Sequence, residues 1–452
     1  MLSSSHTLDR LGVAFDDPHA VANAGLLLPA TVAQHLRLKE LVESHLDLGN
    51  APGRANVGSK TMTVIHSMLA GGDSIDDADV LRAGATHRVL GHELPAPSTL
   101  GPFLRSFTFG HVRQLDAVSR DALQRAWAAG MGPGKSDLTM DLDSTICEAY
   151  GLAKQGVGFG YTRVRGYHPL LATRADTAEL LHSRLRGGSA HTARGADGFL
   201  AETFARVRYA GAAGQLTLRA DSGFYSKKVL TSCRRAGVRF SVTARLDKAV
   251  QRVIATIPED SWVPIPYWSS AGTFGANEHG QPISGADVAE IPYTAFGKKG
   301  MPLRLIVRRV RPTPGTQLAL FTEFGYHALV TDREGSTPEL EADHRRHAEV
   351  EAVIRDLKEG AGLAHLPSGR FAANAAWLAF SALAHNLARW VVGLGLCDRL
   401  PARTTTQRLR RCLFSLPGHH ARSARRETIH LPQRWPWREL FVHALAGMRS
   451  VS

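Results

Sequence analysis

The spacing of apolar residues divides the chain into a helical first part and a mixed second part. Between about residues 20 and 130, segments such as 31–46 and 119–130 carry apolar residues at intervals of three and four, which predicts amphipathic helices. After MGPGKSD, the run LTMDLDSTICEAYG alternates apolar and polar residues, as a half-buried β-strand does. We therefore expect a helical N-terminal region, either a DNA-binding or dimerisation module or a plain helical bundle, and then a core that contains a sheet.

The order of elements in the second part predicts a mixed α/β fold. Strand-like segments come first, and a helix, a strand, a short helix and another strand follow. This order is typical of a mixed sheet with helices on its faces. Short strands divided by Pro and Gly then interrupt the pattern, and helical periodicity returns at 340–360. The expected regions are the N-terminal region 1–130, the first core part 131–246, a β-rich insertion 247–325, the second core part 326–395 and a basic C-terminal region 396–452.

Charge points to a polyanionic partner. The 452 residues include 54 Lys and Arg against 41 Asp and Glu, a formal net charge of +13. Residues 361–452 contain thirteen arginines against three acids, so this end alone carries +10. Nucleic acid is the leading partner class for such a charge, although a solvated basic surface is the plainer alternative.

Two further features bear on compartment and membrane. The four cysteines are far apart and form no C-x-x-C pair, which argues against a zinc knuckle or a disulfide framework and favours a reducing cytoplasm. The most apolar stretch, 371–396, contains Asn374, His385, Asn386 and Arg389. It reads as a buried helix, with His385 and Asn386 as a satisfied buried pair, rather than as a membrane span.

The residues with catalytic chemistry are acidic, despite the basic average. Asp141 and Asp143 are two positions apart on a predicted strand, so their side chains share a face. Asp221 ends the apolar strand QLTLRA, and acids at strand ends commonly face a cleft. Glu351 lies on the late helix. Three such carboxylates would suit Mg²⁺, which prefers oxygen ligands, and a pair of ions roughly 3.5–4 Å apart would activate a water or a DNA 3′-hydroxyl.

A polar stripe surrounds Glu351 on the predicted helix. At about 100° per residue, four cationic or titratable side chains fall on the same side of the helix as this glutamate; they are His344, His347, Arg355 and Lys358. Lys358, two turns beyond Glu351, is a candidate to hold a phosphate near the metal ions.

These segments resemble the DDE transposases of bacterial insertion sequences. The resemblance rests on MDLDST, on RADSGFY and on the pattern H-x-x-H-x-x-x-E-x-x-x-x-x-x-K. Neighbouring segments such as GYHPLLA and AHNLARW resemble the insertion-sequence-thirteen-eighty family, in the branch whose core is split by a β-rich insertion. The resemblance implies a ribonuclease-H-like fold and cut-and-paste transposition with Mg²⁺, for which Mn²⁺ can substitute. It also implies binding to double-stranded DNA, both the terminal inverted repeats and the target, and a homodimer that holds two ends.

Carried over by position, the resemblance assigns the three catalytic, metal-binding acids to Asp143, Asp221 and Glu351, and the signature lysine to Lys358. His344 stands where tyrosine is usual, and His347 where arginine is usual, so their phosphate-contacting roles depart from the family pattern. Asp141 remains a rival for the first acid.

The expected insertion carries a basic segment of its own, formed by Lys298, Lys299, Arg304, Arg308, Arg309 and Arg311. It is a candidate to grip DNA or to support a hairpin intermediate, and an ordinary exposed hairpin is the alternative.

Two other functions fit parts of the sequence. One is a transposase-derived DNA-binding protein without catalysis. The other is a haloacid-dehalogenase-like phosphatase, because DLDST also matches D-x-D-x-T with Asp141 as nucleophile. That class requires a second acid close to a residue such as Asp221, and this sequence has none there. We expect a bacterial, cytoplasmic, nucleoid-associated enzyme with no membrane partner.

Overall fold

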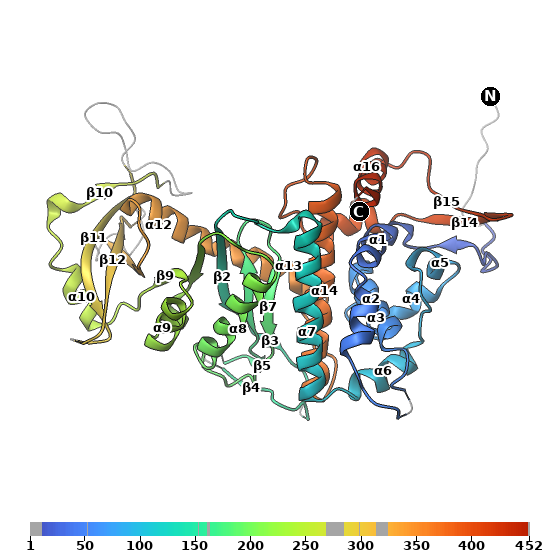
Figure 1. Ribbon diagram of the computed structural model, residues 1–452, viewed down its shortest axis with the longest axis horizontal. Coiled ribbons are helices and arrows are strands. Elements are labelled where there is room, and N and C mark those ends of the chain that lie inside the picture. Colours follow the sequence, from blue (N-terminus) through green and yellow to red (C-terminus); the bar gives the residue numbers. More distant parts are fainter. Residues whose placement is uncertain are drawn as a thin grey trace.

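The computed structural model describes residues 11–51, 53–151, 153–160, 163–267, 284–297, 299–312 and 324–450. It is elongated, with a helical body at one end, a large sheet in the middle and the insertion strands at the other end (Figure 1). A helical N-terminal part followed by a mixed α/β part agrees with the sequence-based prediction.

The N-terminal body is almost entirely helical. Its elements are β1 (Ala20–Val21), η2 (Ala24–Leu26), α1 (Leu27–His35), α2 (Leu38–His45), α3 (Val57–Ala70), η3 (Asp76–Ala78), α4 (Asp79–Arg82), α5 (Thr86–Leu90), α6 (Pro97–Arg105), α7 (Phe109–Ala126) and η4 (Trp127–Met131). The expected helix over 31–46 is broken at Arg37, whose φ of 51° ends α1 and begins α2. Helix α7 begins at Thr108, whose side chain and that of His111 cap each other's backbone N–H groups, as in a capping box.

The core sheet has the strand order of a ribonuclease-H-like fold. Its strands are β2 (Leu138–Ser144), β6 (Leu170–Arg174), β7 (Leu180–Arg184), β8 (Leu216–Ala220) and β9 (Arg239–Thr243). They lie in the order β7-β6-β2-β8-β9. The first three are antiparallel neighbours, whereas β8 runs parallel to both β2 and β9. The fold class expected from the sequence is therefore confirmed. A small second sheet follows β2, made of β3 (Cys147–Glu148), β4 (Gly158–Phe159) and β5 (Arg165–Tyr167).

The insertion is β-rich and continues the core sheet. The predicted range 247–325 contains α10 (Lys248–Ile254), η6 (Glu259–Ser261), β10 (Val263–Pro264), β11 (Ala286–Ala295) and β12 (Met301–Val310), and β13 (Gly325–Thr331) begins at its end. Strand β13 pairs antiparallel with β9, and β12, β11 and β10 follow outward, so among the described residues the sheet has nine strands. The insertion and the core therefore share one hydrogen-bonded sheet.

Helices flank the sheet, and the last of them also contacts the helical body. They are α8 (Ala196–Tyr209), η5 (Ser222–Phe224), α9 (Lys227–Arg235), α12 (Thr337–Arg345), η7 (Arg346–Glu349), α13 (Val350–Gly360) and α14 (Phe371–Gly395). Helix α14 is buried along most of its 25 residues and runs beside α7 between the sheet and the N-terminal helices (Figure 1). Among the described residues, no helix is both long and apolar enough to cross a membrane.

The C-terminal region packs on the N-terminal body. Its elements are α15 (Thr406–Leu409), η8 (Arg410–Phe414), β14 (Gly418–Ser423), β15 (Arg426–His430) and α16 (Arg438–Arg449). Strand β14 pairs with β1 through Ala20 opposite His419, and α16 contacts α14 and α1. The described N-terminal and C-terminal elements thus pack together as one unit.

Candidate active site

Two of the candidate acids lie side by side at the ends of parallel strands. Leu142 and Ala220 are the last paired residues of the ladder between β2 and β8. Asp143 follows Leu142, and Asp221 follows Ala220. Because parallel strands end at the same edge of a sheet, both carboxylates emerge at one place. The Asp221 carboxylate also accepts a hydrogen bond from the Gly223 N–H at 3.0 Å, which fixes the turn that follows the strand.

The third acid, Glu351, lies in the first turn of α13 and is close enough to act electrostatically on Asp143. The pKa of Asp143 is raised to about 6, mainly by burial and in part by the negative charges of Asp221 and Glu351, while the Ser144 N–H and His347 act in the opposite direction. Asp143 is half-buried, whereas Asp221 and Glu351 are exposed. Three carboxylates therefore share one accessible edge of the sheet.

This donor set fits a divalent cation. Carboxylate oxygens are the ligands that Mg²⁺ and Mn²⁺ prefer, and a cation would relieve the repulsion that raises the Asp143 pKa. Within the described part of the chain, the three carboxylates do not all approach within 4.8 Å of one another. The arrangement is thus an open set of acids that a cation would draw together.

Asp141, the rival for the first acid, is fully engaged inside the protein. Both of its carboxylate oxygens accept hydrogen bonds from Arg219 at 2.8 Å, and the Nδ1 atom of His347 lies 2.9 Å away. Asp141 is only 2% exposed. Although burial alone would raise its pKa, His347 and Arg219 hold it below the ordinary value. Of the two acids on β2, Asp143 is the one that reaches the accessible edge.

The two histidines expected to contact phosphate point into the protein. The ring nitrogens of His344 lie 2.9 Å from the hydroxyls of Ser241 and Thr243. Burial lowers the pKa of His344 to about 3, so the ring is neutral. His347 is turned toward Asp141. In this structure neither imidazole is free to contact a phosphate, because each is hydrogen-bonded to a neighbouring strand.

The other two cations of the stripe are more available. Lys358 is half-buried, and its ammonium group donates to the backbone carbonyl of Ile146 at 2.9 Å. Arg355 is exposed on the same helix.

The basic segment of the insertion is largely neutralised by acids. Arg304 pairs with Glu290, and Arg308 with Glu341. Arg309 is buried, pairs with both Asp287 and Glu259, and stacks on two aromatic rings. These partners are distant from Arg309 in the sequence, so the sequence alone did not reveal them. These three arginines are therefore paired within the protein, and their contact with DNA stays a prediction.

Lysines complete the predicted basic segment. Lys299 is exposed, as the prediction requires. Lys298 lies outside the described residues.

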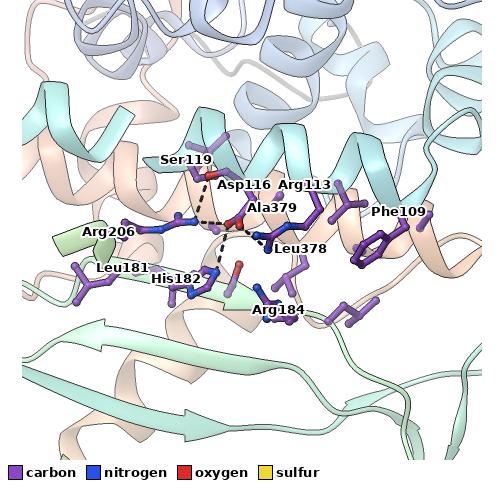
Figure 2. A pocket seen from close by; sticks show the side chains of 18 of the residues that line it. Phe109, Arg113, Asp116, Ser119, Leu181, His182, Arg184, Arg206, Leu378 and Ala379 are labelled. Carbon is purple, nitrogen blue, oxygen red and sulfur yellow. Dashed lines mark hydrogen bonds and ion pairs between the residues drawn. The ribbon is translucent and has the colours of Figure 1, made fainter. Parts of the chain in front are cut away.

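A second acidic cluster, which sequence reasoning missed, lies between α7, β7 and α8. Asp116, His182 and Glu202 have side-chain atoms within 4.8 Å of one another, beside an apolar pocket lined in part by α14 (Figure 2). Three arginines already pair with these acids; they are Arg113, Arg184 and Arg206. Three adjacent guanidinium groups disfavour a bound cation, so the cluster is an ion-pair network that joins the helices to the sheet. The residues lie far apart in sequence and form no spaced motif.

Comparison with known proteins gives the family. A family model described as "Transposase DDE domain group 1" matches residues 4–452. No curated protein matches the chain. One solved structure that resembles it is the cryo-EM structure of the piggyBac transposase synaptic complex with hairpin DNA. That likeness has a TM-score of 0.43 and 9% sequence identity, and covers 87% of this chain and 80% of that one. Since the family model spans nearly the whole sequence, the chain belongs to the DDE-domain transposases of group 1.

Proposed function

We propose that this protein is a cut-and-paste DNA transposase that binds the terminal inverted repeats of its element, cleaves the DNA and transfers the 3′ ends to a target. The observation that carries the proposal is the meeting of Asp143, Asp221 and Glu351 at one edge of the core sheet, where their charges act on one another. Membership of the DDE transposase family supports it. The narrower resemblance to the insertion-sequence-thirteen-eighty family and a bacterial, nucleoid-associated setting are part of the same proposal.

The proposed roles follow from position. Asp143, Asp221 and Glu351 bind Mg²⁺, or Mn²⁺ in its place. Bound divalent ions supply an activated water or 3′-hydroxyl and stabilise the leaving oxygen. Lys358 and Arg355, on the same helix as Glu351, hold the scissile phosphate against the acids. The pKa of Asp143 is raised to about 6. Its carboxylate is therefore mainly ionised, and ready to bind a cation, above that pH.

Binding to DNA is supported by exposed charge in the C-terminal region. Its exposed arginines include Arg408, Arg411, Arg422, Arg425, Arg426 and Arg434. Phosphate contacts of this kind supply most of the affinity for duplex DNA and weaken as salt increases. Two transposon ends must be held together for paired cleavage, and we propose a homodimer for that reason.

The decisive experiment is cleavage of a labelled duplex that carries the inverted repeat flanking the gene. We expect nicking with Mg²⁺, none with EDTA, and none with Asp221→Asn or Glu351→Gln, while mobility-shift assays show unchanged binding. Glu359→Gln is the matched control, because Glu359 is an exposed glutamate on the same helix. Binding without metal-dependent cleavage by the wild type would support the non-catalytic alternative.

The phosphatase alternative loses support from the geometry. Its nucleophile would be Asp141, whose two oxygens are occupied by Arg219 inside the sheet. Hydrolysis of small phosphate esters that is abolished by Asp141→Asn but not by Asp221→Asn would support the phosphatase alternative instead.

A further inference from the structure

A buried polar network lies behind the three acids, and each of its three members comes shortly before one of the acids in the chain. Asp141 precedes Asp143 by two residues on β2, and Arg219 precedes Asp221 by two residues on β8. His347 precedes Glu351 by four residues, about one helical turn. Because side chains repeat every two residues along a strand, Asp141 lies on the same sheet face as Asp143, and Arg219, which is opposite Asp141 in the ladder, lies on that face too.

The contacts tie these three elements to one another. Asp141 and Arg219 are opposite each other in the ladder between β2 and β8, and their side chains form a two-pronged ion pair with both distances at 2.8 Å. The remaining arm of Arg219 donates to the backbone carbonyl of Asp343 at 2.7 Å, near the end of α12. His347 closes the triangle at 2.9 Å from Asp141. Arg333 pairs with the carboxylate of Asp343 from the far side.

The type of interaction suggests a geometric role. Asp141 and Arg219 are 2% and 1% exposed, and well-packed apolar residues often give a protein interior as much stability as a buried ion pair does. A planar guanidinium bonded to both oxygens of a carboxylate, however, fixes distance and orientation more strictly than apolar packing. Metal-binding acids need that kind of support from the residues behind them.

We propose that Asp141, Arg219 and His347 are positioning residues that set the spacing of Asp143, Asp221 and Glu351 for metal binding. The proposal rests on the proposed function, in which those three acids hold the metal ions. It also assigns a task to His347, which stands where the family pattern has an arginine: this side chain holds the neighbouring strand instead of a phosphate.

The test uses Arg219→Lys in the full-length protein. Lysine keeps the positive charge but lacks the planar fork, so it cannot bond both Asp141 oxygens and the Asp343 carbonyl together. We expect Mn²⁺ affinity, measured without DNA by calorimetry, to fall by about ten- to a hundredfold. The cleavage rate at saturating DNA should fall similarly, with the KM for DNA unchanged. If Arg219→Lys fails to fold, His347→Gln replaces it as the test. This variant removes a half-buried partner of Asp141 and should give a smaller loss of Mn²⁺ affinity and cleavage rate.

Arg206→Lys is the matched control. Arg206 is also buried and paired with an aspartate on another element, Asp116, away from the three acids. It should leave Mn²⁺ affinity unchanged even if it lowers the melting temperature. Wild-type Mn²⁺ affinity and cleavage in folded Arg219→Lys and His347→Gln would overturn the positioning role alone. No Mn²⁺ binding by the wild type, or binding that survives Asp221→Asn, would overturn the proposed metal site and the positioning role together.

Discussion

The ammonium group of Lys358 on α13 donates to the backbone carbonyl of Ile146, 212 residues earlier and just beyond β2. This bond fastens the helix of Glu351 to the segment that follows Asp143. It occupies one of the three donors of the lysine, which leaves two to face a phosphate.

Replacing Lys358 by methionine should therefore impair cleavage more than binding. The variant keeps the apolar stem but loses the cation beside the three acids. We expect the single-turnover cleavage rate to fall by about a hundredfold, which is the usual effect of removing one group that stabilises charge in a transition state. DNA affinity should change by less than about twofold. Lys358→Arg should retain part of the rate. Equal losses of affinity and rate in Lys358→Met would assign the lysine to DNA binding instead.

Metal binding should depend on pH through Asp143. Its pKa is raised to about 6, first by burial and then by the charges of Asp221 and Glu351. Below that pH the carboxyl group holds a proton that a cation must displace, whereas above it the group is already ionised. Mn²⁺ affinity should thus fall about tenfold per pH unit below pH 6 and level off above it. Calorimetric titrations from pH 5 to pH 8 measure this; a flat profile would contradict it.

Asp356 should stabilise the protein in a pH-dependent way. It anchors α13 by accepting hydrogen bonds from the N–H and hydroxyl of Thr406 at 2.7 and 2.9 Å. Burial opposes its ionisation, but His385, Arg389 and Thr406 lower its pKa to about 2. Since the folded pKa lies below the ordinary value, the stabilisation is complete above pH 4 and is lost as the pH falls toward 2.

Asp356→Asn should accordingly cost roughly 2 kcal/mol at pH 7, from a shift of about two units. Urea unfolding of both proteins at pH 7 and pH 3 gives the comparison. The difference between them should be smaller at pH 3, and a difference that grows with acidity would show that the sign is wrong.

Glu179 should be a main support of the junction between the sheet and the helices. One of its carboxylate oxygens accepts from the indole N–H groups of Trp127 and Trp390 at 3.1 and 2.8 Å, and the other from Arg174 and Thr177. Glu179→Leu leaves the buried indole N–H groups of Trp127 and Trp390 without an acceptor, at a cost of about 3 kcal/mol or more. Glu179→Gln should cost less. Tryptophan fluorescence during urea unfolding reports both effects.

DNA affinity should respond differently to two cations of the insertion. Arg309 is paired with acids, so Arg309→Ala should destabilise the insertion while leaving the salt dependence of DNA binding unchanged. If exposed Lys299 contacts a phosphate, Lys299→Ala should reduce that slope by about one. A plot of the logarithm of DNA affinity against the logarithm of salt concentration distinguishes the two variants. A reduced slope for Arg309→Ala would show that Arg309 contacts a phosphate of the DNA.

The elements were predictable where local pattern determines them. Alternation identified the strand of Asp143, and the apolar run before Asp221 identified the neighbouring strand, so two of the expected acids were correctly placed at strand ends. The pairing of β13 with β9 was not predictable, because periodicity marks a strand without naming its partner. The same limit hid the bond between Asp141 and Arg219: an arginine on a strand reads alike whether it faces solvent or a buried acid. His347 followed the motif spacing, yet only the fold reveals that it faces inward.

The pairing of β1 with β14 has a consequence for synthesis. When the ribosome has made the helices that follow β1, the strand and the long helix that cover them are still hundreds of residues away. A polypeptide stopped after the insertion would expose the apolar flanks of these early helices. Such truncated products should aggregate or be degraded in the cell, because the early helices are covered only after the C-terminal region has been made.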